Sequence, residues 1–138
     1  MTSAGGGVRF LIVDDDESIH LFLQVILAPY GECATASTGD RAVEMFVEAR
    51  DNGQPFDVVL MDILMPGMDG HQASELMRAK EQEDGVAEAD SFKLAMITCM
   101  VDDTSIDKAF FNARASVYIV KPLDRHKVIS ELKEHGII

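Results

Sequence analysis

Short apolar runs alternate along the chain with longer segments in which apolar residues recur at helical spacing. The runs are candidate β-strands, and there are five: Val8–Val13, Cys33–Ala36, Val58–Met61, Leu94–Ile97 and Val117–Val120. The runs VVLM, LAMI and VYIV are nearly continuous in apolar character, which is typical of strands covered on both faces in a parallel sheet.

The segments between the runs predict amphipathic helices. Ile19, Phe22, Leu23 and Ile26 fall at i, i+3, i+4 and i+7, and this helix should stop at Ala28-Pro29 because proline cannot continue it. Four further stripes share this spacing, and the first of them should end near Asn52-Gly53: Ala42, Met45, Phe46 and Ala49; Ala73, Leu76 and Met77; Ile106, Ala109, Phe110 and Ala113; Val128, Ile129 and Leu132. The β-α order, repeated five times, predicts an α/β fold with a doubly wound parallel sheet, helices on both faces and right-handed crossovers.

Two segments fall outside this alternation. Residues 1–7, MTSAGGG, predict a flexible N-terminal lead, and residues 8–138 predict one domain, which suits a chain of 138 residues. Lys80–Ser91, KEQEDGVAEADS, is acidic and poor in apolar residues, and it predicts a solvated, mobile loop before the fourth strand.

Composition narrows the class of protein. The chain is 47% hydrophobic and 26% charged, as in ordinary soluble domains, and its 12 basic against 24 acidic residues give a net charge of −12. This balance argues against direct nucleic-acid binding, which depends on Lys and Arg, and it is compatible with a cation or a basic partner surface.

The cysteines and the apolar runs indicate a reducing compartment. Cys33 and Cys99 lie far apart with no C-x-x-C motif, so we interpret both as small buried hydrophobes and not as zinc ligands or a disulfide framework. The N-terminal apolar run is too short for a signal peptide, and no segment approaches a membrane span. We therefore expect a cytoplasmic protein that does not insert into membranes.

Acidic residues follow the first apolar run directly, in the stretch FLIVDDDESIH. Neighbouring carboxylates raise each other's pKa and weaken the fold unless a positive charge compensates. A solvated acidic loop is one explanation, and Asp16 also suits the N-cap of the following helix. A cation site is the other explanation, and the ends of the remaining strands bear on the choice.

Polar groups follow three other strands: Asp62 after the third, Thr98 after the fourth, and Lys121 with Pro122 after the fifth. In doubly wound sheets, ligands collect beyond the carboxyl ends of the strands. Carboxylate oxygens from Asp14, Asp15 and Asp62 would suit Mg²⁺, and the metal would offset their repulsion. Lys121 adds an ammonium that can pair with a phosphate.

Four sequence blocks, FLIVDDDESI, DVVLMDILMPGMDG, MIT and YIVKPL, together resemble the receiver domains of two-component response regulators, most closely the single-domain CheY-like kind. The similarity extends from Val8 to the C-terminus. It implies a flavodoxin/CheY-like fold with strand order 2-1-3-4-5.

The resemblance also implies a phosphoacceptor and a metal site. Asp62 would take a phosphoryl group from a histidine of a sensor histidine kinase or phosphotransfer protein. Mg²⁺ would be held by the carboxylates of Asp15 and Asp62, the backbone carbonyl of Leu64 and, mostly through water, Asp14. A carboxylate is a competent phosphoryl acceptor, and catalysis of this transfer is mainly positioning and charge neutralisation. We therefore expect the chain to catalyse only its own phosphorylation and dephosphorylation and otherwise not to be an enzyme.

The remaining implied roles concern the phosphoryl group and the signal. Lys121 would bind a phosphoryl oxygen, and its bond to Pro122 would be cis. Thr98 would hydrogen-bond the phosphoryl group, and Tyr118 would swing inward behind it. The signal would leave through the fourth helix, fifth strand and fifth helix, near Ile106–Lys133. Because no output module follows Ile138, we expect docking onto a downstream protein.

Two departures from the family pattern predict differences in behaviour. Leu64 and Met100 lie where relatives flank the path of the water that hydrolyses the aspartyl phosphate, positions that are often polar. Two apolar side chains there predict slow self-dephosphorylation. The segment FFNARASVY lacks the usual glycine-containing turn and carries one extra residue, which favours a partner surface with unusual specificity.

Alternative functions fit less well. A haloacid-dehalogenase-like phosphatase needs a second Asp where Leu64 stands. A calcium loop starting at Asp14 has Ile19 where Gly is required, and a dinucleotide-binding loop is absent because Gly5–Gly7 precede the first strand. A receiver-like docking scaffold that does not switch stays open, as does the choice between chemotaxis and another phosphorelay.

Overall fold

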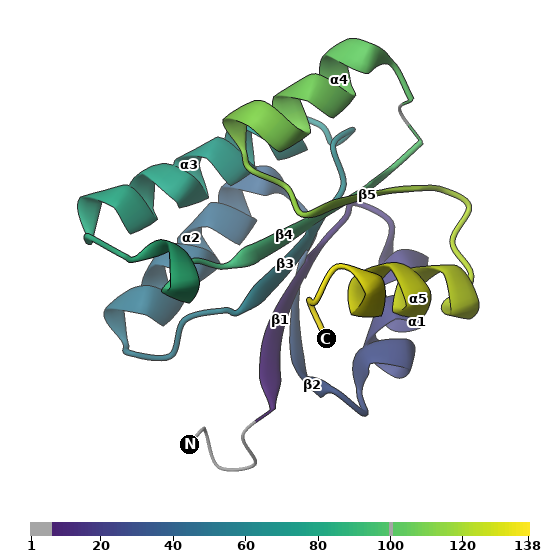
Figure 1. Ribbon diagram of the computed structural model, residues 1–138, viewed down its shortest axis with the longest axis horizontal. Coiled ribbons are helices and arrows are strands. Elements are labelled where there is room, and N and C mark those ends of the chain that lie inside the picture. The colour runs from purple at the N-terminus through teal and green to yellow at the C-terminus, as the bar shows by residue number, and fades with distance from the viewer. Residues whose placement is uncertain (1–6, 100) are drawn as a thin grey trace.

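The computed structural model describes residues 7–99 and 101–138, so all of the predicted lead over residues 1–7 except Gly7 lies outside the described part of the chain. Figure 1 shows its strands and helices in the alternating order that the sequence predicts. The strands are β1 (Val8–Val13), β2 (Gly31–Ala36), β3 (Val58–Met61), β4 (Lys93–Thr98) and β5 (Val117–Val120). The helices are α1 (Glu17–Leu27), α2 (Gly39–Asp51), α3 (Gly70–Glu83), α4 (Asp103–Asp107) and α5 (Arg125–Glu134), with a 3₁₀ turn η1 (Glu88–Asp90) and a π-helical turn η2 (Lys108–Asn112).

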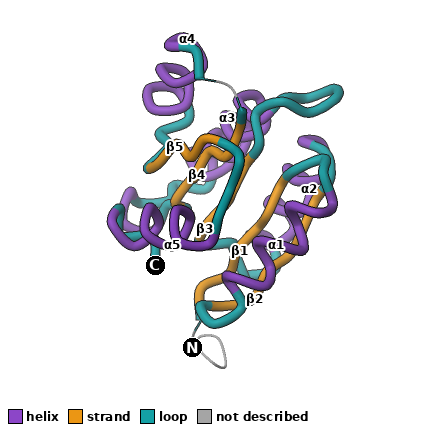
Figure 2. Tube along the Cα trace, turned by 90° about the vertical axis from the view of Figure 1, so that its right-hand side faces the viewer, coloured by secondary structure: helices purple, strands orange, loops and turns teal. Residues whose placement is uncertain are grey.

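The five strands are parallel and lie in the order β2-β1-β3-β4-β5, with β2 and β5 at the two edges (Figure 2). Successive residues of each strand face opposite layers. Leu11, Val59 and Leu94 pack in one layer with α2, α3 and η2, whereas Phe10, Leu60 and Ala95 pack in the other layer with α1 and α5. Both layers are filled with apolar side chains, which is why the strands are apolar at consecutive positions. The predicted doubly wound fold and its strand order are confirmed.

The helices begin at polar residues whose side chains accept hydrogen bonds from the first turn. Asp16 accepts from the Ser18 N–H at 2.9 Å, which confirms it as the N-cap of α1. Asp69 and Gln72 form a capping box at the start of α3, with reciprocal bonds of 2.9 and 3.0 Å. Helix α1 ends at Leu27, shortly before Pro29, as predicted.

The prediction of a solvated loop over residues 80–91 is wrong over its first part, whereas residues 84–85 and 87–90 are exposed as predicted. Helix α3 continues to Glu83, and Glu81 is only 3% exposed. The Glu81 carboxylate accepts hydrogen bonds from the Phe92 N–H at 2.8 Å, from the Ser91 hydroxyl and from Arg78. Arg78 and Phe92, both outside the segment, therefore help to hold the Glu81 carboxylate in the interior.

Arg78 is the centre of this buried cluster and connects three parts of the chain. Its Nε donates to the Ala113 carbonyl at 2.7 Å, and its Nη2 donates to the Arg114 carbonyl at 3.1 Å. Its Nη1 donates to the Phe92 carbonyl at 2.8 Å, and the guanidinium lies 3.8 Å from the centre of the Phe92 ring. Burial lowers the pKa of Arg78 to about 10, although the charge of Glu81 opposes this shift. Arg78 therefore ties α3 to the start of β4 and to the turn before β5.

The fourth helix differs from the predicted single stripe. Regular α-helix covers only residues 103–107, and the next turn is π-helical, with the Ala113 N–H donating to the Lys108 carbonyl. A π-turn accommodates one extra residue, which agrees with the additional residue expected in this segment. Ala109 and Ala113 are buried, but Phe110 is 39% exposed and does not belong to the core stripe.

Three smaller predictions are also corrected. Leu76, assigned to the buried face of α3, is 45% exposed, because the core contacts of this helix come from Ala73 and Met77. Cys99 is exposed because it lies beyond the end of β4, and Cys33 is only partly buried because it lies in the edge strand β2.

Over residues 7–99 and 101–138, no helix combines the length and apolar character needed to span a membrane.

Candidate functional site

The carboxyl ends of four strands bring the predicted site residues to one edge of the sheet. Asp14 follows β1, Asp62 follows β3, Thr98 ends β4 and Lys121 follows β5. Asp14 is fully buried and Asp62 is 4% exposed, whereas Asp15 is exposed to solvent. One carboxylate oxygen from each of these three Asp residues lies within 4.8 Å of the others. The predicted carboxylate cluster therefore forms.

Lys121 lies between two of these carboxylates. Its Nζ donates to Asp14 Oδ2 at 2.8 Å and to Asp62 Oδ2 at 3.2 Å. Burial disfavours the ammonium, but the hydrogen bond to Asp14 and the charges of Asp62 and Asp14 outweigh burial and raise the pKa of Lys121. Lys121 is thus held as a cation at the point where the predicted phosphoryl group would lie.

One ammonium does not balance the negative charge of the cluster. Burial and repulsion from Asp14 raise the pKa of Asp62, although Lys121 acts in the opposite direction. A second cation beside Asp62 would reverse this penalty. Three converging carboxylate oxygens, one of them on the solvent-exposed Asp15, suit a hard cation that retains waters. The residues present therefore fit Mg²⁺.

Backbone groups fix the directions of the two buried carboxylates. Asp14 Oδ1 accepts from the Asp16 N–H at 2.9 Å, and Asp62 Oδ1 accepts from the Leu64 N–H at 3.3 Å. The loop after β3 folds back tightly, and the Gly70 N–H donates to the Ile63 carbonyl at 2.9 Å. A Cβ at Gly70 would lie 2.2 Å from the Asp62 carbonyl oxygen, so this close approach requires glycine.

The predicted switch residues lie beside this cluster. Thr98 is fully buried, and its carbonyl accepts from the Lys121 N–H at 2.8 Å. Tyr118, half-buried in β5, has its ring centre 6.4 Å from that of Phe110. Burial and the negative charges of Asp102 and other nearby groups raise the pKa of Tyr118. The Lys121–Pro122 peptide bond is cis, as the resemblance implies.

Of the two residues predicted to tune dephosphorylation, the structure describes Leu64 but not Met100. Leu64 is 50% exposed, and its backbone N–H donates to Asp62 Oδ1. Met100 lies outside the described residues, so its predicted role is not tested.

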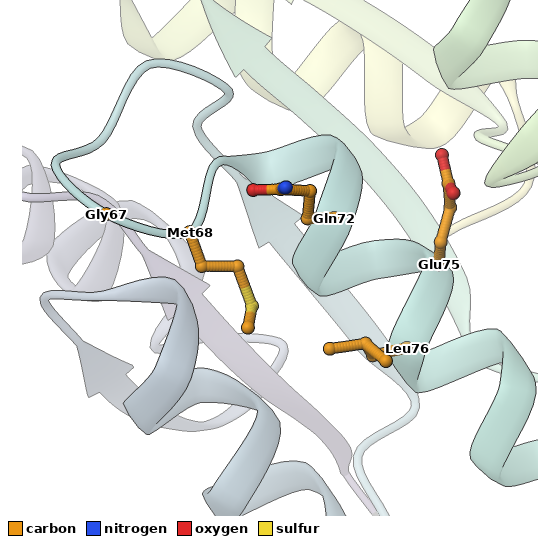
Figure 3. A pocket seen from close by; sticks show the side chains of 5 residues that line it. All are labelled: Gly67, Met68, Gln72, Glu75 and Leu76. Carbon is orange, nitrogen blue, oxygen red and sulfur yellow. The ribbon is translucent and has the colours of Figure 1, made fainter.

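A separate pocket of about 540 Å³ opens beside the loop between β3 and α3. Its lining residues are Gly67, Met68, Gln72, Glu75 and Leu76. Figure 3 shows the Met68 and Leu76 side chains extending toward one another and Glu75 pointing away from them. The three clustered carboxylates do not line this pocket, so it is distinct from the candidate cation site.

His71 lies outside the site, on the first turn of α3, and is 6% exposed. Neither ring nitrogen has a hydrogen-bond partner among the residues that the structure describes. Burial lowers the pKa of His71, and the charge of Lys108 adds to this effect, whereas Asp69, Glu75 and Asp102 oppose it. The neutral imidazole is therefore the form that the fold favours.

His71 should make folding stability depend on pH. Because its pKa is lower in the folded than in the unfolded protein, the stabilising effect of the neutral ring is complete above about pH 6.5, the unfolded value, and is lost as pH falls through the folded pKa. We expect His71→Leu to raise the free energy of unfolding by about 1 kcal/mol at pH 7, since it removes unpaired buried nitrogens. The variant should also lose less stability than the wild type between pH 7 and pH 5.

Urea unfolding at the two pH values measures this difference. The exposed His126, changed to leucine, is the control and should leave the pH dependence of the wild type intact. Equal pH dependence in His71→Leu and the wild type would show that the buried ring does not titrate in this range.

Comparison with known proteins decides the family. Residues 10–133 match the response regulator receiver domain. The chain belongs to this family. The match covers nearly all of the described residues, so the resemblance seen in the motifs extends through the whole receiver.

Curated relatives include regulators and sensor kinases. The receiver is 30% identical over 127 residues to the transcriptional regulatory protein AruR of Pseudomonas aeruginosa, covering 91% of this chain and 48% of AruR. It is 43% identical over 75 residues to the sensor protein GacS of Pseudomonas syringae, covering 54% of this chain and 8% of GacS. The receiver therefore spans about half or less of the length of these relatives.

Solved structures share the fold of the receiver. The chemotaxis protein CheY4 of Vibrio cholerae has a TM-score of 0.77 at 25% identity, with 93% of this chain and 98% of that chain covered. A CheY-like receiver domain protein of Methanospirillum hungatei has a TM-score of 0.74 at 28% identity, with 93% and 92% covered. A CheX–CheY–BeF3–Mg complex of Borrelia burgdorferi gives 0.75 at 25% identity, with 100% and 96% covered. The fold is CheY-like.

Two residues of the receiver's site were not indicated as functional by the sequence patterns. Gly70 follows Asp69 in the capping-box pattern D-G-x-Q, which signals a helix start but not the close approach to Asp62. His20 shares the buried face of α1 with Leu23 and Leu27. In the sequence, only its polar character on an apolar helix face could have indicated a functional role.

Proposed function

We propose that this receiver accepts a phosphoryl group on Asp62 with the help of Mg²⁺ and passes the resulting change to a partner protein. The arrangement of Asp14, Asp15, Asp62 and Lys121 carries the proposal, because it combines a cation site with an ammonium next to one carboxylate. The donor would be a phosphohistidine of a sensor kinase or a phosphotransfer protein.

Phosphoryl transfer would proceed by attack of an Asp62 carboxylate oxygen on phosphorus. The phosphorus–nitrogen bond of the donor histidine breaks, and the released imidazole takes up a proton. Asp15 and Asp62 would hold Mg²⁺ through carboxylates, Leu64 through its carbonyl and Asp14 through water. The metal supplies charge neutralisation and alignment of the phosphoryl oxygens. Lys121, already 3.2 Å from Asp62 Oδ2, would pair with a phosphoryl oxygen.

The signal requires more than one new contact. A hydrogen bond from Thr98 to a charged group contributes about 1.5–3 kcal/mol, whereas inverting a two-state equilibrium from 1:99 takes about 5.5 kcal/mol. Lys121 and the repacking of Tyr118 would supply the remainder. The Tyr118 ring already lies beside that of Phe110. Phe111, the next residue of the π-helical turn η2, is 80% exposed. A change at Tyr118 would therefore alter the aromatic surface formed by Phe110 and Phe111.

The relatives support this proposal. GacS is named a sensor protein and AruR a transcriptional regulatory protein, as expected for relatives of a receiver that passes on a signal. The Borrelia CheY structure is named as a complex with BeF3 and Mg. This likeness supports a kinase or phosphotransfer protein as the partner. We also propose that the receiver acts in the cytoplasm and catalyses only its own phosphorylation and dephosphorylation.

The competing function is a docking scaffold that does not switch. Incubation with Mg²⁺ and acetyl phosphate, followed by intact-protein mass spectrometry, separates the two functions. We expect one phosphoryl group on the wild type and none on Asp62→Asn. An unmodified wild type, or equal modification of Asp62→Asn, would support the scaffold.

Phosphorylated Asp62 should lose its phosphate slowly because Leu64 shields the site and cannot orient a water molecule. We expect Leu64→Asn to accelerate the decay several-fold, less than the roughly 10²–10⁴-fold of a positioned general acid or base, because an amide can orient a water molecule but cannot take its proton. Decay is followed by mass spectrometry after removal of acetyl phosphate. Leu76→Asn is the matched control, because Leu76 is a similarly exposed leucine on α3, and it should decay like the wild type. Unchanged decay in Leu64→Asn contradicts the shielding role.

A further inference from the structure

His20 is a buried side chain next to the carboxylate cluster that neither the core stripes nor the proposed ligand set include. It lies on the first turns of α1 and is 7% exposed. Its Nε2 lies 2.7 Å from the backbone carbonyl oxygen of Asp14. Because a carbonyl oxygen can only accept, Nε2 carries the proton in this bond.

The Asp14 carbonyl belongs to the peptide unit that joins Asp14 to Asp15. This unit is planar, so holding its oxygen also fixes its N–H and the Cα of Asp15. The other bonds of Asp14 act elsewhere: its N–H donates to the Ala36 carbonyl at 3.2 Å, and its carboxylate accepts from the Asp16 N–H and Lys121. Among the described residues, the side chain of Asp15 has no hydrogen bond or ion pair. The direction of Asp15 therefore depends on the peptide that His20 holds.

We propose that His20 is a positioning residue for the divalent-cation site, orienting the Asp14–Asp15 peptide so that the Asp15 carboxylate faces Asp62. The proposal rests on the proposed function, because it assigns His20 to the same Mg²⁺ site. His20 acts through the backbone and is not itself a ligand, since its Nε2 is occupied by the carbonyl. Residues that orient metal ligands in this way typically contribute 10- to 100-fold to metal affinity.

Two substitutions separate positioning from mere packing. His20→Leu keeps an apolar body of similar size but has no donor. His20→Gln places an amide N–H the same number of bonds from Cα as Nε2, so it can restore the hydrogen bond. We expect Mg²⁺ to bind about tenfold more weakly to His20→Leu, and His20→Gln to recover most of the affinity.

A second readout does not involve the metal. The Asp15 N–H belongs to the peptide that His20 polarises, so its ¹⁵N and ¹H resonances in metal-free protein should shift in His20→Leu and return toward wild type in His20→Gln. If His20→Leu does not fold, His20→Asn replaces it, because the asparagine amide is one bond too short to reach the carbonyl.

Ile26→Val is the matched control. Ile26 is buried at the far end of α1, so this variant weakens helix packing without touching the loop at Asp14. We expect its Mg²⁺ affinity to equal that of the wild type. Equal affinity in His20→Leu and the wild type, or equal loss in Ile26→Val, overturns the positioning role. A wild type that binds no Mg²⁺ contradicts the proposed function instead, and the Asp15 resonances still test whether His20 holds the peptide.

Discussion

Arg78→Leu should lower the free energy of unfolding by about 3–5 kcal/mol, which is the usual cost of removing one partner of a buried ion pair. The substitution leaves the Glu81 carboxylate, only 3% exposed, without its cation. It also leaves the carbonyls of Phe92, Ala113 and Arg114 without the donors that they accept from. Since small domains have only about 5–15 kcal/mol in total, this loss is a large share of the stability of the receiver. Urea denaturation followed by circular dichroism measures the loss.

Two further variants show that the loss comes from the buried charge. Arg78→Lys should recover little, because one ammonium cannot replace a planar group that donates to five oxygens from three segments. Arg78→Leu combined with Glu81→Leu should recover part of the stability, since the unpaired carboxylate is gone. If Arg78→Leu alone costs less than about 1 kcal/mol, in the range of exposed ion pairs, the cluster does not hold the turn before β5 as described.

Lys121→Met should slow the phosphorylation of Asp62 by acetyl phosphate about 100-fold, the usual effect of removing one charge-stabilising group from a transfer site. The ammonium lies within 3.2 Å of both Asp14 and Asp62 oxygens, so the variant leaves three carboxylates with no compensating cation from the protein. The same substitution should lower the free energy of unfolding by about 2 kcal/mol in the absence of metal, through lost charged hydrogen bonds. Added Mg²⁺ should restore part of that stability.

Lys93→Met provides the control for Lys121→Met. Lys93 is exposed at the start of β4, at the opposite end of the sheet from the carboxylates. Its substitution should leave the phosphorylation rate unchanged. If acetyl phosphate phosphorylates Lys121→Met as fast as the wild type, the Lys121 ammonium has no part in the transfer.

The sequence predicted the parts of this molecule that depend on local pattern. Val58–Met61 is a strand with both faces buried, and its four consecutive apolar residues indicated this directly. Because parallel strands end at one edge, the positions of Asp14, Asp62 and Lys121 after their strands were enough to predict that they meet. The family resemblance added the strand order and the roles of single residues.

The errors concern contacts between segments distant in sequence. Glu81 occurs in an acidic stretch and was expected to be solvated, but Arg78 and Phe92 bury it. Phe110 fits a helical stripe, but it lies within the π-helical turn η2, and its ring lies beside that of Tyr118 with 39% of the residue exposed. His20 could be identified only once the fold placed it 2.7 Å from the Asp14 carbonyl.

The proposed function depends on a Mg²⁺ site formed by Asp14, Asp15 and Asp62. Titration of the metal-free receiver with Mg²⁺, followed by amide resonances and melting temperature, tests it most directly. We expect saturable shifts at residues 14, 15 and 62 and a higher melting temperature, because a ligand at 100 times its Kd adds about 2.7 kcal/mol of stability. Asp15→Asn should weaken both responses. Spectra and a melting temperature that do not respond to Mg²⁺ in the wild type would contradict the account.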